Sequence, residues 1–155
     1  MLLTWLQFAG VFLAGILAGE ELIVRWGVQP ALHRLDDRSH VHARMALVRR
    51  LMVAVPVIMI PTVIVAILVV VFAGTGPGLA FRIAGIASLA VFLGCSFLGT
   101  VPINITINET WNPDAPPTDW REVVRRWEVL DTFRSSAATL AFACFLAAVA
   151  LESSA

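Results

Sequence analysis

The chain has 155 residues, of which 59% are hydrophobic and only 14% charged, and its formal net charge is zero. Soluble domains carry about 25% charged residues, so this composition, with a mean hydropathy of +0.84, predicts an integral membrane protein in a lipid bilayer. No extended basic face remains outside the membrane, which excludes nucleic acid as a partner.

Four apolar runs are long enough to cross a bilayer. The expected spans are about 2–26, 51–72, 79–101 and 132–151. The second span contains Pro56 and Pro61, which membrane helices tolerate, and the sequence "AGTGPG" at 73–78 predicts a tight turn before the third span. The sequence therefore predicts an all-α, four-helix membrane bundle that forms a single domain over residues 1–155.

Positive charge is concentrated in the two long connections between spans. All 11 basic residues are arginines, and the connections hold Arg34, Arg38, Arg44, Arg49, Arg50, Arg121, Arg125 and Arg126. By the positive-inside rule both connections are cytoplasmic and both termini lie outside. We therefore expect a multi-pass protein of the plasma membrane, and the exclusive use of arginine fits a GC-rich bacterial genome.

The second connection is expected to be partly helical. "NPDAPPTDW" is a cluster of turn residues, and Thr118 or Asp119 can cap a helix that follows it. The stretch "DWREVVRRWEVLDTFR" then predicts a helix that runs into the fourth span without a break.

Two adjacent carboxylates, Glu20 and Glu21, lie before the end of the first apolar run. An ionised group in hydrocarbon is costly and marks a functional candidate by default. Glu21 and Arg25 are one helical turn apart and can pair on one face, whereas Glu20 needs another partner. The pair is either structural, or one glutamate is an intramembrane acid or base.

A second polar set lies at the start of the fourth span. Trp127, Asp131 and Arg134 recur at i, i+4 and i+7 and so share one helix face, which must look into the bundle. This face either forms interhelical salt bridges with Glu20 and Arg25, or it binds a substrate. In the second case Arg134 holds an anionic oxygen while Asp131 or Glu20 moves a proton.

Asn104 and Asn108 share a face if the third helix continues past Pro102. Asn104 then serves either in a helix–helix hydrogen bond or as a donor to a substrate carbonyl.

The histidines of the first connection offer a further alternative. His40 and Arg44 are one turn apart, but His40 and His42 lie on different faces of a helix. We expect interface residues here, with no cofactor; the alternative is a metal or haem site with iron or copper held by His40 and His42.

Two segments, "GTVPIN" at the end of the third span and "WNPDAPPTDWREVVRRWEVLDTFR" before the fourth, resemble the anthrone oxygenase-like membrane family, also called domain of unknown function 1772. That family shows a P-x-N element, here Pro102 and Asn104, and a W-x-x-x-[polar]-x-x-R element, here Trp127, Asp131 and Arg134. Many members carry histidine in place of Asp131. The opening "AGEELIVRWGVQPAL" looks like an actinobacterial branch with paired glutamates.

The resemblance implies an oxygenase or oxidoreductase that acts on a flat, lipophilic, phenolic or quinone-like molecule. Loss of a proton from the anthrone methylene gives a carbanion that reacts with dioxygen without a metal. Glu20 or Asp131 would be the base, and Arg134 and Asn104 would bind the carbonyl oxygen. The other substrate-binding candidates are Trp127, against the flat rings, and Glu21, Arg25 and Arg44. The alternatives are a non-catalytic bundle that binds a lipid, a quinone, a partner helix or a second copy, and a metal or haem protein.

Overall fold

The computed structural model describes residues 1–153, which form helices and no strand. The elements are α1 (Leu2–Ile23), η1 (Val24–Val28), α2 (Gln29–Leu32), α3 (Asp37–Phe72), α4 (Leu79–Cys95), η2 (Ser96–Thr100), α5 (Val101–Thr110) and α6 (Trp120–Ser153). The π-helical segments η1 and η2 join their neighbours into continuous rods. The four rods are long and apolar enough to cross a membrane, which confirms the four-helix membrane architecture.

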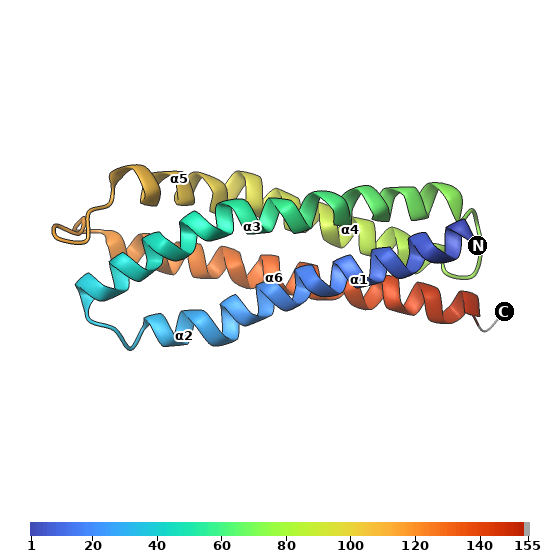
Figure 1. Ribbon diagram of the computed structural model, residues 1–155, viewed down its shortest axis with the longest axis horizontal. Coiled ribbons are helices and arrows are strands. Elements are labelled where there is room, and N and C mark those ends of the chain that lie inside the picture. The colour runs from blue at the N-terminus through green and yellow to red at the C-terminus, as the bar shows by residue number, and fades with distance from the viewer. Residues whose placement is uncertain (154–155) are drawn as a thin grey trace.

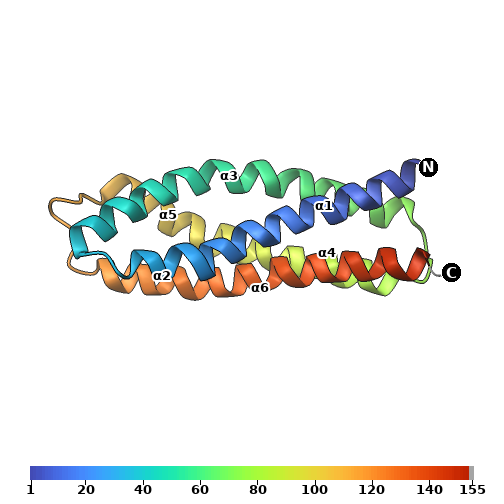
Figure 2. The ribbon, with the colours of Figure 1, turned by 60° about the horizontal axis from the view of Figure 1, so that its bottom comes forward.

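The rods lie side by side along the long axis of the molecule (Figure 1). The α1 rod packs on α3 and α6, while α4 packs most closely on α6 and α5 packs on α3. Both termini and the 73–78 turn lie at one end, and the two polar connections lie at the other (Figure 1 and Figure 2). We call the end with the connections the polar end of the bundle; its orientation in a membrane stays a prediction.

Each rod continues past its apolar run into the polar connections. Helix α3 begins at Asp37, where the side chain of Asp36 accepts a hydrogen bond from the backbone N–H of Ser39 at 3.1 Å, as an N-cap residue does. Helix α6 begins at Trp120, directly after Asp119, and runs into the apolar segment without a break. The helical connections therefore extend the bundle beyond the hydrocarbon layer.

Small residues bring α4 and α6 close together. A Cβ atom added at Gly85 would overlap the ring of Phe145, so a larger residue at this crossing would require that ring to move. Helix α6 presents Ala137, Ala138, Ala141 and Ala148 to the core. Close approach through small residues is how membrane helices gain packing energy, since lipid supplies no hydrophobic drive between them.

Two buried apolar clusters follow one another along the bundle. The larger one fills the centre and includes Leu17, Met59, Leu89, Phe92 and Phe145. The second lies toward the polar end, with these members: Val41, Met45, Val48, Ile107, Trp111, Trp120 and Val124. The functional candidates of α1 and α6 lie where these two clusters meet.

Candidate functional site

A buried ion pair joins the first and last helices. Arg134 Nη2 of α6 donates to Glu21 Oε1 of α1, and both side chains are almost fully buried. Asp131 lies one turn before Arg134, with 4.0 Å between its Oδ1 and Arg134 Nη1. Gln29 of α2 donates to Asp131 Oδ2 at 2.5 Å. The shared face of Trp127, Asp131 and Arg134 thus points into the bundle, as its spacing predicts.

Glu21 does not pair with Arg25, contrary to the expectation from their spacing. Arg25 Nη1 instead donates to the hydroxyls of Ser135 and Ser136 on α6, at 3.1 and 3.2 Å. Arg25 is the second residue of the π-helical segment η1, Val24–Val28. Glu21 pairs instead with Arg134 of α6.

Glu20 is half-buried beside this pair. It is close enough to Arg134 and Glu21 to interact with both. One oxygen of each glutamate, Oε2, is buried and has no hydrogen-bond partner among residues 1–153, and the same is true of Arg134 Nε. Buried polar atoms are rarely left without a partner, so these three atoms mark a place where a further polar group or a proton can be accommodated.

Asn104 and Trp127 form the second part of the site. The indole N–H of Trp127 donates to Asn104 Oδ1 at 2.8 Å, and both side chains are buried. Helix α5 begins at Val101 with Pro102 in its first turn, where proline is tolerated. The helix therefore continues far enough to carry Asn104 inward. Asn108, one turn on, accepts instead from Arg49 Nε at 2.8 Å.

Arg44 packs behind Trp127. Its guanidinium carbon lies 4.9 Å from the centre of the indole ring, and its Nη2 donates to Glu128 Oε1 at 2.9 Å. Glu128 also contacts His33 Nε2 at 2.9 Å. Arg44 is thus fully buried in a cation–π and ion-pair contact.

The two histidines of the alternative metal or haem site are not brought together. His40 is buried against the ring of Trp120, with 4.9 Å between ring centres, whereas His42 is exposed. Within residues 1–153, no three His, Cys, Asp or Glu side chains gather as a metal site requires.

A pocket of about 230 Å³ lies between α3 and the α4–η2–α5 rod. Its walls are mostly apolar, and its polar lining comes from Ser96, Thr100, Asn104 and Arg134. The apolar lining residues are Leu51, Met52, Val55, Pro56, Met59, Phe97 and Val101. Met52 and Phe97 are 38% and 57% exposed, so the pocket reaches the outer surface of the bundle between α3 and η2.

Only two of the predicted site residues, Asn104 and Arg134, line this pocket. Glu21 and Asp131 contact Arg134 but do not line the pocket. Arg44 and Trp127 lie behind Asn104. The structure therefore has one layer that faces the pocket and a second layer that holds the first in place.

The π-helical segment η2 shapes the pocket. Ser96, Phe97 and Thr100, which line it, all belong to η2. Segments of this kind inside α-helices occur often at functional sites. No residue pattern in the sequence predicts the π-helical segments η1 and η2.

Sequence reasoning also missed Gln29 and Glu128. The apolar residues near Gln29 show no helical spacing that would mark it as facing the bundle. Glu128 looks like one of several charges on an exposed helix. Their partners, Asp131 and Arg44, come from distant parts of the chain. Only the tertiary fold gives these two side chains a role.

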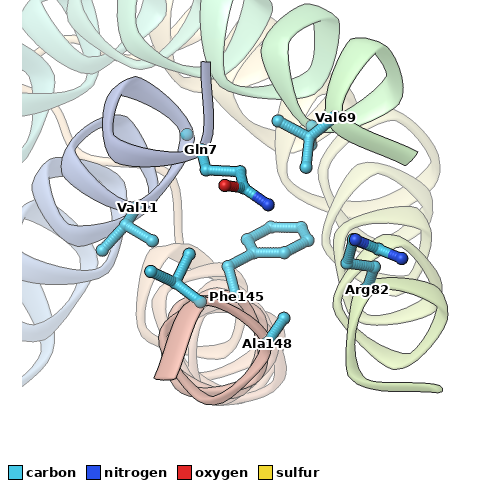
Figure 3. A pocket seen from close by; sticks show the side chains of 9 residues that line it. Gln7, Val11, Val69, Arg82, Phe145 and Ala148 are labelled. Atoms are coloured by element: carbon cyan, nitrogen blue, oxygen red, sulfur yellow. The ribbon is translucent and has the colours of Figure 1, made fainter. Parts of the chain in front are cut away.

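A third polar group lies at the opposite end of the bundle. Arg82 is 1% exposed, and Glu152 accepts from both Arg82 Nη1 and Gln7 Nε2. Figure 3 shows Gln7 and Arg82 approaching the ring of Phe145 from α1 and α4. The pocket between them has about 20 Å³, room for about one water molecule. This group ties three helices together far from the larger pocket.

The fold and the site define a class: a multi-pass helical membrane protein with a lateral, largely apolar pocket whose polar lining includes an arginine and an asparagine. Residues 45–144 match the family model described as Anthrone oxygenase. The match covers most of the chain, and the chain belongs to this family. It includes every residue that lines the pocket, whereas Glu20, Glu21 and Gln29 precede it. Comparisons with curated proteins and with solved structures gave no match.

Proposed function

We propose that this protein is an oxidoreductase that oxidises a flat, lipophilic carbonyl or phenolic compound with dioxygen. The observation that carries this proposal is the pocket between α3 and the α4–η2–α5 rod, where Arg134 and Asn104 form the only strongly polar wall. A volume of about 230 Å³ is slightly below the roughly 300–1,000 Å³ of small-molecule sites, which suits a flat molecule of few rings.

The pocket's position supports entry from the bilayer. Its exposed lining residues, Met52 and Phe97, are apolar and lie on the lipid-facing surface. A lipophilic substrate partitions into lipid and reaches the pocket from the side without crossing water. We place the protein in a bacterial plasma membrane with its polar end in the cytoplasm, as the positive-inside rule predicts.

In the proposed reaction, an anthrone-like ketone binds with its carbonyl oxygen toward Arg134 and the Asn104 amide. These donors stabilise the enolate oxygen that forms when the methylene carbon loses a proton. The carbanion adds dioxygen to give a hydroperoxide, which loses water and leaves a second carbonyl. In total, one molecule of the ketone reacts with one molecule of dioxygen to give one quinone and one water. This route therefore uses no cofactor.

The proton acceptor in this proposal is the Glu20–Glu21 pair. Each carboxyl has a buried oxygen without a donor among the residues described, and Arg134 links Glu21 to the pocket. Because neither glutamate lines the pocket, the proton reaches the pair through water. Asp131 also lies outside the pocket wall; it contacts Arg134 and accepts a hydrogen bond from Gln29.

The test is oxygen uptake by the purified protein in lipid nanodiscs with anthrone as substrate. We expect Glu20→Gln to abolish uptake while the protein remains folded and monodisperse, and Arg134→Gln to abolish it with some loss of stability, because that change leaves Glu21 without its ion-pair partner. Arg126→Gln is the matched control, because Arg126 lies exposed on the same helix and outside the pocket. Uptake retained in both site variants would refute the proposal.

The second candidate is a non-catalytic bundle that binds a lipid or quinone. It is favoured by one observation: the carboxylates lie behind Arg134 and not in the pocket wall. In that case the polar contacts only hold α1 to α6, and each substitution lowers thermal stability in proportion to any loss of binding. Activity lost at unchanged stability in Glu20→Gln separates the enzyme from this alternative.

A further inference from the structure

The carboxamide of Asn104 has a fixed orientation. An indole nitrogen is a donor only, so the atom of Asn104 that lies 2.8 Å from Trp127 Nε1 must be the carbonyl oxygen Oδ1. The NH2 group is then turned away from Trp127. It makes no hydrogen bond to any residue in 1–153, and Asn104 lines the pocket. Free amide donors are therefore available on the pocket side.

Trp127 is itself held on several sides. It is 0% exposed, and Arg44 lies over its ring at 4.9 Å. Arg44 is anchored in turn by Glu128 at 2.9 Å. The indole N–H cannot turn away from Asn104 without breaking this packing, so the orientation of the amide is set by the neighbouring helices.

The other polar side chains that line the pocket are those of Ser96, Thr100 and Arg134. The hydroxyl of Ser96 donates to the Phe92 carbonyl at 2.7 Å, and that of Thr100 to the Ser96 carbonyl at 3.3 Å. Arg134 has only donors. The strongest polar groups that face the pocket are thus N–H donors, and the amide oxygen that would change this is occupied by Trp127.

We infer that Trp127 is a positioning residue: its indole N–H turns the Asn104 amide so that the NH2 group faces the pocket and recognises an acceptor oxygen of the ligand. Trp127 acts through Asn104 and does not contact the ligand. This inference rests on the proposed function, because it assumes that the pocket binds a ketone or phenolate.

The test compares two ligands that share a ring skeleton. Anthrone carries the carbonyl, and 9,10-dihydroanthracene lacks it. Binding of each is measured without oxygen, by equilibrium dialysis against the protein in nanodiscs. The ratio of the two affinities reports recognition of the carbonyl oxygen, since the apolar contacts cancel.

We expect Trp127→Phe to lower this ratio about 2- to 10-fold, as the loss of one oriented hydrogen bond does, with little change for dihydroanthracene. Asn104→Asp keeps the shape of the side chain but presents a carboxylate oxygen to the pocket, so it lowers the ratio at least as far. Trp111→Phe, at another buried tryptophan of the polar end, leaves the ratio unchanged.

A second readout needs no ligand. The Trp127 indole N–H gives its own signal in a nitrogen–proton spectrum, assigned in the wild-type protein from its through-space contacts with the Asn104 side chain. Asn104→Leu should speed hydrogen exchange at this proton, while the other indole signals stay protected. This measurement keeps the inference testable if Trp127→Phe does not fold.

The outcomes separate the inference from the proposed function. A wild-type protein that prefers anthrone, with the preference kept in Trp127→Phe or in Asn104→Asp, overturns the inference alone. A wild-type protein that binds the two ligands equally overturns both. Unchanged exchange of the Trp127 proton in Asn104→Leu overturns the inference whatever the ligands do.

Discussion

Arg134 and Glu21 form a buried ion pair that joins the last helix of the bundle to the first. An isolated charge at this depth costs several kcal/mol, so each side chain is tolerable only in the presence of the other. The pair also fixes Arg134, which lines the pocket, through a residue that does not. One contact thus serves both the packing of α1 on α6 and the geometry of the site.

Breaking this pair from one side should be much more damaging than removing it. Arg134→Leu leaves the buried carboxylate of Glu21 unpaired, and we expect a loss of about 3–5 kcal/mol in the free energy of unfolding. The double variant Glu21→Leu/Arg134→Leu should lose less than Arg134→Leu, because it also removes the carboxylate that the single change leaves unpaired. Reversible unfolding in mixed micelles, followed by circular dichroism, measures all three.

The control is Arg25→Leu, which removes an arginine that donates to hydroxyl and carbonyl oxygens and lies over the ring of Trp26. It should cost about 1 kcal/mol or less per hydrogen bond lost. Additive effects of the Glu21→Leu and Arg134→Leu substitutions in the double variant would contradict a direct pairing.

The sequence is sufficient to predict the four apolar rods and the inward face of Trp127, Asp131 and Arg134, because both depend on local hydropathy and helical period. It leaves open whether the third helix continues past Pro102, and the inward position of Asn104 depends on that. It cannot predict the partner of Glu21. Helical spacing offers Arg25 as the partner, whereas the actual partner, Arg134, lies 113 residues further along the chain.

The pocket lies beyond sequence reasoning for a similar reason. Its walls come from α3 and from η2, and apolar residues such as Met52 and Phe97 look like ordinary lipid-facing positions. The family resemblance implies that Trp127 contacts the flat rings of a substrate, but the structure places it behind Asn104. Which residues face a cavity and which lie one layer behind depends on helix rotation, and hydropathy alone does not determine it.

Gly85 offers a test of the close packing between α4 and α6. A methyl group there would overlap the Phe145 ring, so Gly85→Ala should lower stability by about 1–3 kcal/mol, as overpacking does. Gly94→Ala is the matched control on the same helix, since nothing lies within 4 Å of its added Cβ. It should be neutral or slightly stabilising, because alanine favours helix more than glycine.

A compensating change sharpens this prediction. Gly85→Ala combined with Phe145→Leu should recover part of the lost stability, because the smaller side chain makes room for the new methyl group. No recovery in the double variant would show that the cost at Gly85 comes from elsewhere. Thermal unfolding in one detergent at one protein concentration compares these variants with the wild type.

Asp36 gives the start of α3 a defined pH dependence. Hydrogen bonds from Ser39, at its side chain and backbone N–H, hold the pKa of Asp36 below its ordinary value of 3.8. The ionised cap therefore stabilises the folded helix end at pH above 3.8, and this contribution is lost as the pH falls through the lowered pKa. Hydrogen exchange at the Ser39 amide, corrected for intrinsic rate, should show protection that fades in this range.

The Asp36→Asn variant provides the comparison, because it keeps a capping side chain that does not titrate. Protection of the Ser39 amide in that variant should be independent of pH over the same range. A variant that loses protection in parallel with the wild type would assign the pH dependence to another group.

The side entrance to the pocket can be closed without disturbing the polar wall. Met52 lines the pocket, and its neighbour Val53 is 66% exposed on the outer surface. Met52→Trp should fill the entrance between α3 and η2 and weaken binding of anthrone at least tenfold, with thermal stability nearly unchanged. Val53→Trp adds the same bulk at a position that faces lipid and should leave binding as it is. If both variants bind anthrone like the wild type, the ligand reaches the protein elsewhere, and the lateral pocket is not its site.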